Sequence, residues 1–314
     1  MGIGILVLFL SKFTDQQFAQ IKDSISRARY SLILVSVLLG LASHVLRALR
    51  WEQLLRTVTN RRLNKWNLIF AVGISYLMNL GIPRSGEVSR AVTVQKYEGI
   101  PFNKAFGTII TERLIDLVML GLFVLVGFFL SYDEIARMLG PAMPDHPLIL
   151  SVFLLMAAAG AYWLWRKSRH WHHPWVRKIH VWIRELKTGM LSLARIRRPG
   201  WFILQTIVIW LLYLLMLWVV MLAFPETRHL GWDAVIMAFL AGSISIVISN
   251  GGIGTYPVFV TEVLTLYGVS KEAGFAFSTV MWSAQTLMLI LAGILSFIFL
   301  PWVNGRSAKA PSRY

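Results

Sequence analysis

The chain lacks cysteine and contains few charged residues. Its 314 residues include no Cys, and only 15% are charged, whereas 56% are hydrophobic. The absence of Cys excludes disulfides, thiolate nucleophiles and Cys-ligated metals. The seven His show no HExxH or equivalent spacing, so we expect no metal site and no cofactor. With a mean hydropathy of +0.62, the chain is too apolar for a soluble globular protein and is expected to lie in a bilayer.

The charged residues that are present are mainly basic. Lys and Arg number 31 against 15 Asp and Glu, which gives a formal net charge of +16. On a soluble chain this excess, with the interleaved Trp, His and Arg of residues 163–182, would indicate nucleic-acid binding. In a membrane protein, such a segment is expected to lie on anionic headgroups. We therefore expect membrane lipids, anionic ones in particular, as partners, and no nucleic acid.

Six apolar stretches approach the roughly 20 residues that a membrane-spanning helix needs. The first is only half long enough and lacks the basic start and cleavage site of a signal peptide, so either this helix continues through Phe13 or the natural start lies upstream. The six stretches are residues 1–10, 30–49, 105–131, 147–165, 201–224 and 273–300.

Loop charge predicts the orientation. Three loop or tail segments together hold 18 basic and two acidic residues, and they are residues 50–66, 166–200 and 301–314. The other three loops hold six residues of each sign, and they are residues 11–29, 132–146 and 225–232. The positive-inside rule therefore places the first set, and with it the C-terminus, on the cytoplasmic side of an inner (plasma) membrane.

Two shorter apolar stretches predict re-entrant hairpins. Residues 67–82 and 233–248 are short and lead into polar sequence that contains Gly or Pro. Given the loop orientation, residues 67–104 must enter and leave on the cytoplasmic side, and residues 233–270 on the outer side. The alternative is eight ordinary helices with kinks.

The order helix, helix, hairpin, helix then occurs twice, and each copy crosses the membrane an odd number of times, so the second copy is inverted. Paired broken helices in an inverted repeat are typical of secondary transporters. The predicted fold is an all-α polytopic membrane protein with about six full spans and two re-entrant hairpins. Its parts are a first repeat (1–131), an outer loop (132–146), a second repeat (147–300) and a basic cytoplasmic tail (301–314).

The first hairpin contains the densest group of charged and helix-breaking residues. Pro83 ends a helix, and Arg84 beside the start of the next helix suits an anion. Alternatively, these charges merely satisfy one another and the broken backbone. The candidate substrate-binding residues here are Asn79, Arg84, Gly86, Glu87 and Arg90.

Three further charges lie inside the apolar stretch 105–131. Glu112 and Asp116 are spaced i,i+4 and share one helix face, with Arg113 beside both. A charge at bilayer depth costs at least ~2.5–3.5 kcal/mol, so such residues are usually paired and functional. We expect either acid to pair with Arg84 or Arg90, or to carry a coupling proton, a role for which Glu87 is also a candidate. Arg113 is a further candidate substrate-binding residue. A purely structural ion-pair network is the alternative.

A second break follows residue 248. Three glycines in four positions before Pro257 cannot form a regular helix, and their amides can line an anion-binding concavity. A glycine-mediated helix contact is the alternative. Glu262 follows as a further candidate for charge pairing or proton coupling. The candidate substrate-binding residues here are Asn250, Gly251, Gly252, Gly254, Thr255 and Tyr256.

The end of the second apolar stretch carries Arg47, Arg50 and Trp51. Basic and aromatic residues at a helix end are typical of membrane-interface anchors, and long Arg side chains can extend to the headgroups. We therefore predict that these three side chains lie at the membrane interface. His44, one turn earlier, is predicted to be a packing residue.

Four motifs in this order resemble the lysylphosphatidylglycerol synthase transmembrane (flippase-like) family, along essentially the whole chain. They are Leu46-Arg-Ala-Leu-Arg50-Trp51, Asn79…Pro83-Arg84-x-Gly86-Glu87-x-x-Arg90, Glu112-Arg113-x-x-Asp116 and Gly251-Gly252-x-Gly254. That family is similar to the lipid-flippase domain of the multiple peptide resistance factor. The resemblance implies a stand-alone lipid or polyprenyl-lipid translocator without the aminoacyl-transferase domain. Many members carry Glu three residues after the last glycine of the second break, where this chain has Pro257.

The sequence thus favours a translocator of a phosphate-bearing phospholipid or polyprenyl phosphate. A membrane enzyme acting on a lipid headgroup is the first alternative, with Glu87, Glu112 or Asp116 as general base. No catalytic constellation accompanies these acids, so we do not expect an enzyme. A non-transporting partner subunit is the second alternative.

Overall fold

The computed structural model describes residues 2–132, 156 and 196–305. Within these residues the chain is helical and forms no strand, which confirms the all-α fold class. The predicted span 147–165 and most of the loops 132–146 and 166–200 and of the tail 301–314 lie outside the described residues.

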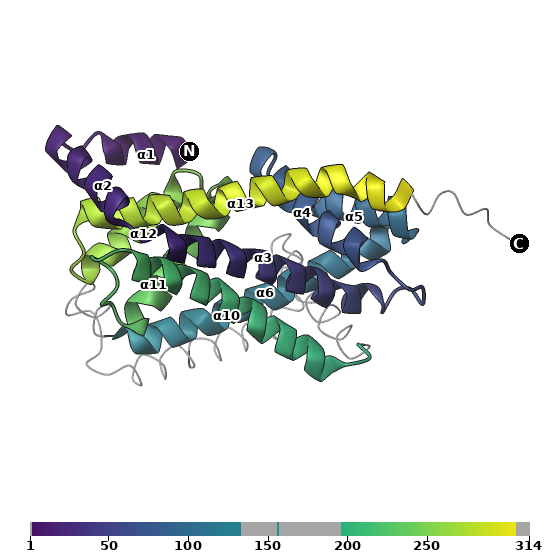
Figure 1. The fold of residues 1–314 in the computed structure, drawn as a ribbon. Helices are drawn as coiled ribbons and strands as arrows, with labels where there is room; N and C mark the ends of the chain where they lie inside the picture. Colours follow the sequence, from purple (N-terminus) through teal and green to yellow (C-terminus); the bar gives the residue numbers. More distant parts are fainter. Residues whose placement is uncertain (1, 133–155, 157–195, 306–314) are drawn as a thin grey trace, which may run out of the picture.

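Four described helices are long and apolar enough to cross a membrane, and they match four of the six predicted spans. They are α3 (Tyr30–Leu55), α6 (Phe102–Leu130), α10 (Pro199–Ala223) and α13 (Lys271–Gly305). α3 packs against α10 and α13. Figure 1 shows α13 running along almost the full length of the described fold. At 1.5 Å per residue, α13 is roughly 50 Å long, which exceeds the hydrocarbon thickness of a bilayer.

The N-terminal apolar stretch forms only the nine-residue helix α1 (Gly2–Leu10), which ends before Phe13. It is followed by α2 (Asp15–Arg27), which packs against α13 at one end of the fold (Figure 1). The prediction of a loop over residues 11–29 is therefore wrong for most of this segment. Its start is a capping box in which Thr14 and Gln17 exchange hydrogen bonds between side chain and backbone, a pattern that predicts a helix N-terminus.

Two pairs of shorter helices lie toward opposite ends of the fold (Figure 1). The first pair is α4 (Lys65–Gly81) and α5 (Ser85–Glu98), which are separated at Pro83 as the sequence predicts. The second pair is α11 (Trp232–Ile248) and α12 (Thr255–Leu266), joined through the short 3₁₀ turn η3 (Asn250–Gly252). α13 packs against both α4 and α12.

The turns of the two pairs touch each other. The Asn250 Nδ2 donates a hydrogen bond to the Leu80 carbonyl oxygen over 3.0 Å, which joins residues 170 positions apart. Gly251 packs closely against the Leu80 side chain, since a Cβ added to Gly251 would lie 3.1 Å from Leu80 Cδ2. The indole nitrogen of Trp282 in α13 donates a hydrogen bond to the Gly251 carbonyl oxygen over 2.9 Å. The positive φ angles of Gly251, Gly252 and Gly254, 63°, 75° and 75°, allow the backbone to turn here.

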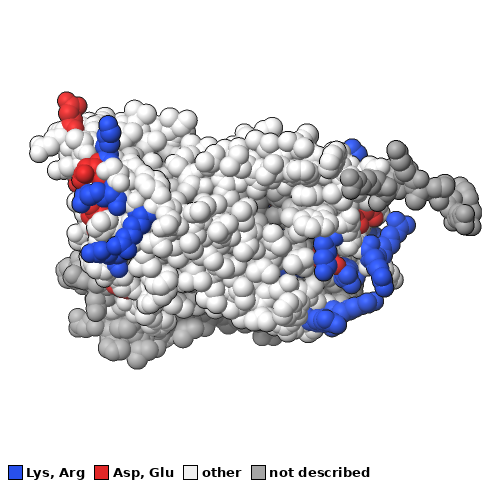
Figure 2. Space-filling model, viewed as in Figure 1, with Lys and Arg blue, Asp and Glu red and all other residues white. Residues whose placement is uncertain are grey.

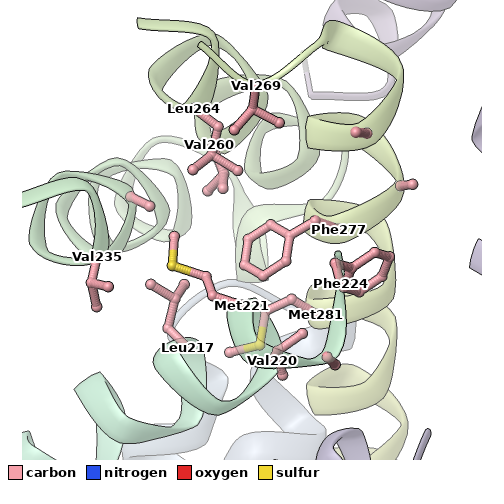
Figure 3. Packing of buried hydrophobic residues seen from close by; sticks show 14 of the residues in the cluster. Leu217, Val220, Met221, Phe224, Val235, Val260, Leu264, Val269, Phe277 and Met281 are labelled. Carbon is pink, nitrogen blue, oxygen red and sulfur yellow. The ribbon is translucent and has the colours of Figure 1, made fainter. Parts of the chain in front are cut away.

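Each pair is built into its own apolar core. Figure 3 shows Leu217 of α10, Val235 of α11, Val260 of α12 and Phe277 of α13 filling one of them. The second core gathers side chains of α3, α4, α5 and α6, among them Trp51, Leu68, Val94 and Ile109. The two cores hold the helix pairs in place, so the turns between the paired helices meet with only a few contacts of their own.

The close approach of α4 and α5 gives a test of the first pair. A Cβ on Gly86 would lie 2.2 Å from the Ser75 carbonyl oxygen, whereas a Cβ on Gly81 would meet no atom within 4 Å. We expect Gly86→Ala to destabilise the protein by about 1–3 kcal/mol because backbone must move. Gly81→Ala, the matched control, should be close to neutral. Thermal unfolding of the detergent-solubilised protein measures both, and equal midpoints would contradict the packing described.

Candidate functional site

A cluster of charged side chains is buried where α3, α5 and α6 come together. α3 contributes Arg47 and Arg50, α5 contributes Arg90, and α6 contributes Glu112 and Asp116. Of the residue surface, 5% of Arg47, 2% of Arg90 and none of Arg50 or Glu112 is exposed. Because an isolated charge in such surroundings is very costly, the contacts among these side chains decide whether the helices can pack.

Glu112 lies at the centre of the cluster. Its Oε1 accepts hydrogen bonds from Arg47 Nε over 2.6 Å and from Arg50 Nη2 over 3.4 Å. Its Oε2 accepts one from Arg90 Nη2 over 2.7 Å. One carboxylate therefore contacts all three arginines, and it connects α6 with both α3 and α5.

Asp116, one turn further along α6, contacts the two arginines of α3. It accepts hydrogen bonds from Arg47 and from Arg50, the latter over 2.9 Å. The same two arginines reach α10, where Arg47 donates to the Tyr213 hydroxyl over 3.0 Å and Arg50 to the Thr206 hydroxyl over 3.2 Å. Four helices are thus joined by one polar network.

Trp51 positions the third arginine. The guanidinium of Arg90 lies 3.7 Å from the centre of the Trp51 ring, within the range of a cation–π contact. The indole nitrogen of Trp51 donates to the Thr108 hydroxyl of α6 over 2.9 Å, which holds the ring in place. Stacking of this kind keeps the Arg90 guanidinium directed toward α6.

The cluster carries an excess of positive charge. Three arginines face the two carboxylates of Glu112 and Asp116, and a nearby pair, Arg113 Nη2 and Glu87 Oε1 at 2.9 Å, adds no net charge. The Nε atoms of Arg50 and Arg90 are buried without a hydrogen-bond partner in the described part of the chain. A buried group with one surplus cation and spare donors can bind an anion.

The structure buries Arg47, Arg50 and Trp51 among helices, so their side chains do not extend outward as interface anchors would. α3 continues to Leu55 rather than ending at residue 49, and Arg50 and Trp51 have no exposed surface. The face of α3 that they occupy packs on other helices. A stripe of small residues on that face, buried with Arg47 and Arg50, could have indicated this, and it consists of Ser36, Gly40 and Ser43.

Arg84 and Arg90 have different surroundings. Arg90 pairs with Glu112 inside the cluster, which is one of the pairings predicted from the sequence. Arg84 lies exposed in the turn between α4 and α5, forms no ion pair within the described residues, and adopts a left-handed φ of 63°. Such a conformation is unfavourable for a residue with a side chain. The two arginines therefore do not hold one group together in this conformation.

The remaining candidates of the first hairpin and Glu262 have other surroundings. The Asn79 Oδ1 accepts a hydrogen bond from the Gly86 amide over 2.8 Å, so these two residues close the turn. Glu262 is exposed and lies 3.5 Å from Lys271, on the helix pair away from the charge cluster. It has no contact with the other candidate acids.

The candidates of the second break mainly stabilise the break itself. Asn250 and Gly251 contact the first pair or α13, as described above. The Thr255 hydroxyl donates to the Ser245 carbonyl oxygen over 3.1 Å, and Tyr256 is buried against Gly242. No group of His, Asp and Glu suited to a metal ion exists in the described part of the chain.

The four long apolar helices are those of a multi-pass membrane protein. Within that class, the chain belongs to the family of the lysylphosphatidylglycerol synthase TM region, whose model matches residues 1–293. This finding confirms the resemblance carried by the four motifs and indicates a function connected with membrane lipids. No curated protein and no solved structure matches the chain.

The burial of Trp51 can be tested against an exposed tryptophan. We expect Trp51→Ala to cost about 3–5 kcal/mol of unfolding free energy because it leaves a cavity and removes the Arg90 and Thr108 contacts. Trp66→Ala, at a side chain that is 59% exposed, should change the value by less than about 1 kcal/mol. Denaturant unfolding in detergent measures both variants. A Trp51→Ala variant as stable as Trp66→Ala would contradict the burial of Trp51 and favour a position at the membrane interface.

Proposed function

We propose that the protein translocates a phosphate-bearing lipid, a phospholipid or a polyprenyl phosphate, across the inner membrane. The observation that carries the proposal is the buried cluster in which three arginines face two carboxylates. A surplus cation with spare donors suits a phosphate, and membership of a lipid-related family supports a lipid as its carrier.

The arrangement of the helix pairs supports a transporter architecture. In Figure 2, Lys, Arg, Asp and Glu gather at two ends of the visible face and leave a broad band between them without charges. We propose that this band lies in the bilayer and that α4–α5 and α11–α12 are re-entrant hairpins of two inverted repeats. Their turns would then meet within the membrane, where secondary transporters bind their substrates.

In this proposal the exposed Arg84 contacts the lipid phosphate first, and the buried arginines receive it when the helix pairs separate. Separation requires little, because the turns are joined by the Asn250–Leu80 hydrogen bond and a few apolar contacts. The acyl chains can remain in the bilayer, so only the headgroup crosses the protein.

The contacts of the acids argue against a headgroup-modifying enzyme. Glu112 accepts hydrogen bonds from three arginines and Asp116 from two. The oxygens of both acids are thus engaged by guanidinium donors within the fold, whereas a general base must be within hydrogen-bond reach of the proton that it abstracts.

Arg84 provides a test that separates function from stability. Glycine adopts a left-handed φ without steric cost, so Arg84→Gly should leave the unfolding midpoint no lower than that of the wild type. We expect the same variant to lose most headgroup translocation in liposomes that contain fluorescent phospholipids, because the exposed cation is gone. The control is Arg84→Lys, which keeps the positive charge and should retain activity. A glycine substitution of another lysine, such as Lys104→Gly, is not a suitable control because Lys104 lies in a helix. Unaltered translocation by Arg84→Gly would contradict the assignment.

The contact between the two turns can be locked with thiols, since the chain contains no Cys of its own. We expect the Leu80→Cys/Asn250→Cys variant, joined by a short reducible crosslinker, to stop translocation, and reduction to restore it. Each single variant treated with the same reagent is the control. Full activity of the crosslinked protein would show that the turns need not separate.

A further inference from the structure

Glu112 occupies a position that is built for an anion. Its carboxylate is the only one in the described residues that contacts Arg47, Arg50 and Arg90 together. The three guanidinium groups come from two helices and converge on its two oxygens, and none of the Glu112 surface is exposed. Convergent guanidinium donors are the arrangement by which proteins bind carboxylate and phosphate oxygens.

The position offers more donors than a carboxylate uses. The Nε atoms of Arg50 and Arg90 are buried and have no hydrogen-bond partner among the described residues, although Glu112 lies beside both side chains. A phosphate group presents more acceptor oxygens than a carboxylate and could engage these donors as well. The cluster also has one surplus positive charge, which a singly charged phosphate would neutralise.

We propose that Glu112 is an internal competitor for the transported anion. In the conformation described, its carboxylate fills the position among Arg47, Arg50 and Arg90, and a phosphate group takes that position when Glu112 withdraws. The inference rests on the proposed function and adds the residue that sets how tightly the phosphate is held. Without phosphate, Glu112 offsets part of the arginine charge, and a bound phosphate is never held by all three arginines without competition, which favours its release.

A purely structural ion-pair network makes a different prediction. If Glu112 only neutralises the arginines, removing its charge destabilises the protein, and added phosphate has no more effect than any salt. If it competes with phosphate, removing its charge exposes a preformed anion site. The protein then gains phosphate affinity while it loses stability in the absence of phosphate.

The experiment compares Glu112→Gln with Asp116→Asn in the full chain, purified in a neutral detergent. Both substitutions remove one negative charge, but only the first vacates the position contacted by all three arginines. Unfolding midpoints are measured in sodium phosphate and in sodium chloride at equal ionic strength. A second arm adds phosphatidylglycerol or, as its phosphate-free counterpart, diacylglycerol, so that free phosphate and lipid phosphate are distinguished.

We expect Glu112→Gln to be stabilised by phosphate or by phosphatidylglycerol with an apparent Kd at least about tenfold lower than that of the wild type, a difference of roughly 1.4 kcal/mol. Asp116→Asn should show no such gain. The double variant Glu112→Gln/Arg90→Gln restores the charge balance of the wild type and removes one donor, and it should lose the response.

An equal response of Glu112→Gln and Asp116→Asn, or no response of Glu112→Gln, overturns the inference. If Glu112→Gln does not fold even with phosphate, Glu112→Asp takes its place. Its shorter side chain withdraws the carboxylate from part of the site, and it should bind phosphate more tightly than the wild type. Unchanged affinity would overturn the inference.

Two further outcomes separate this inference from the proposed function. If the wild type translocates lipid but no variant responds to phosphate, the role of Glu112 as a competitor is refuted and the proposed function is not. A phosphate response without translocation by any protein refutes the proposed function.

Discussion

The ion pairs of Glu112 are the interaction on which the arrangement of the helices depends. This one carboxylate holds two arginines of α3 and one of α5 against α6, and the arginines of α3 extend the network to α10. Breaking a buried pair by removing one partner typically costs 3–5 kcal/mol, because the other charge is left without compensation. The four helices therefore cannot shift independently while the network is intact.

The contact between the two helix pairs is weak by comparison. A neutral hydrogen bond such as that between Asn250 and Leu80 contributes about 0.5–1.5 kcal/mol, far less than the charge network. Each pair is anchored in its own apolar core, and α13 packs against both. Relative motion would thus occur first at the turns, while each core remains packed. This division of strong and weak contacts suits a protein that opens in its middle.

Features that depend on local sequence could be predicted. Pro83 and the glycines after residue 248 place the two breaks correctly. The proline ring and the positive φ angles of glycine restrict or free the backbone at the residue itself, so their effect can be predicted from local sequence. Four spans follow from the length of their apolar stretches. The helix α2 was missed, although the Thr14 and Gln17 capping box is a local signal.

The composition of the charge cluster could not be predicted in full. The i,i+4 spacing of Glu112 and Asp116 indicates a shared face, but their partners come from helices distant in sequence. Arg84 and Arg90 are six residues apart in one hairpin, yet one is exposed and the other buried. Which of two arginines is buried is decided by the packing of α5 on α6, and sequence spacing contains no information on that packing.

Two features of the first helix pair reduce stability and are retained. Arg84 has a left-handed backbone conformation, which costs a non-glycine residue roughly 1–2 kcal/mol, although glycine would fit there. The charge cluster keeps a third arginine that its two carboxylates do not neutralise, in surroundings where a charge is expensive. Residues that reduce stability persist where the function needs them. Arg84 and Arg90 are both cations of the first helix pair. An anion that bound first to Arg84 in the turn and then beside Arg90 would neutralise the two charges one after the other.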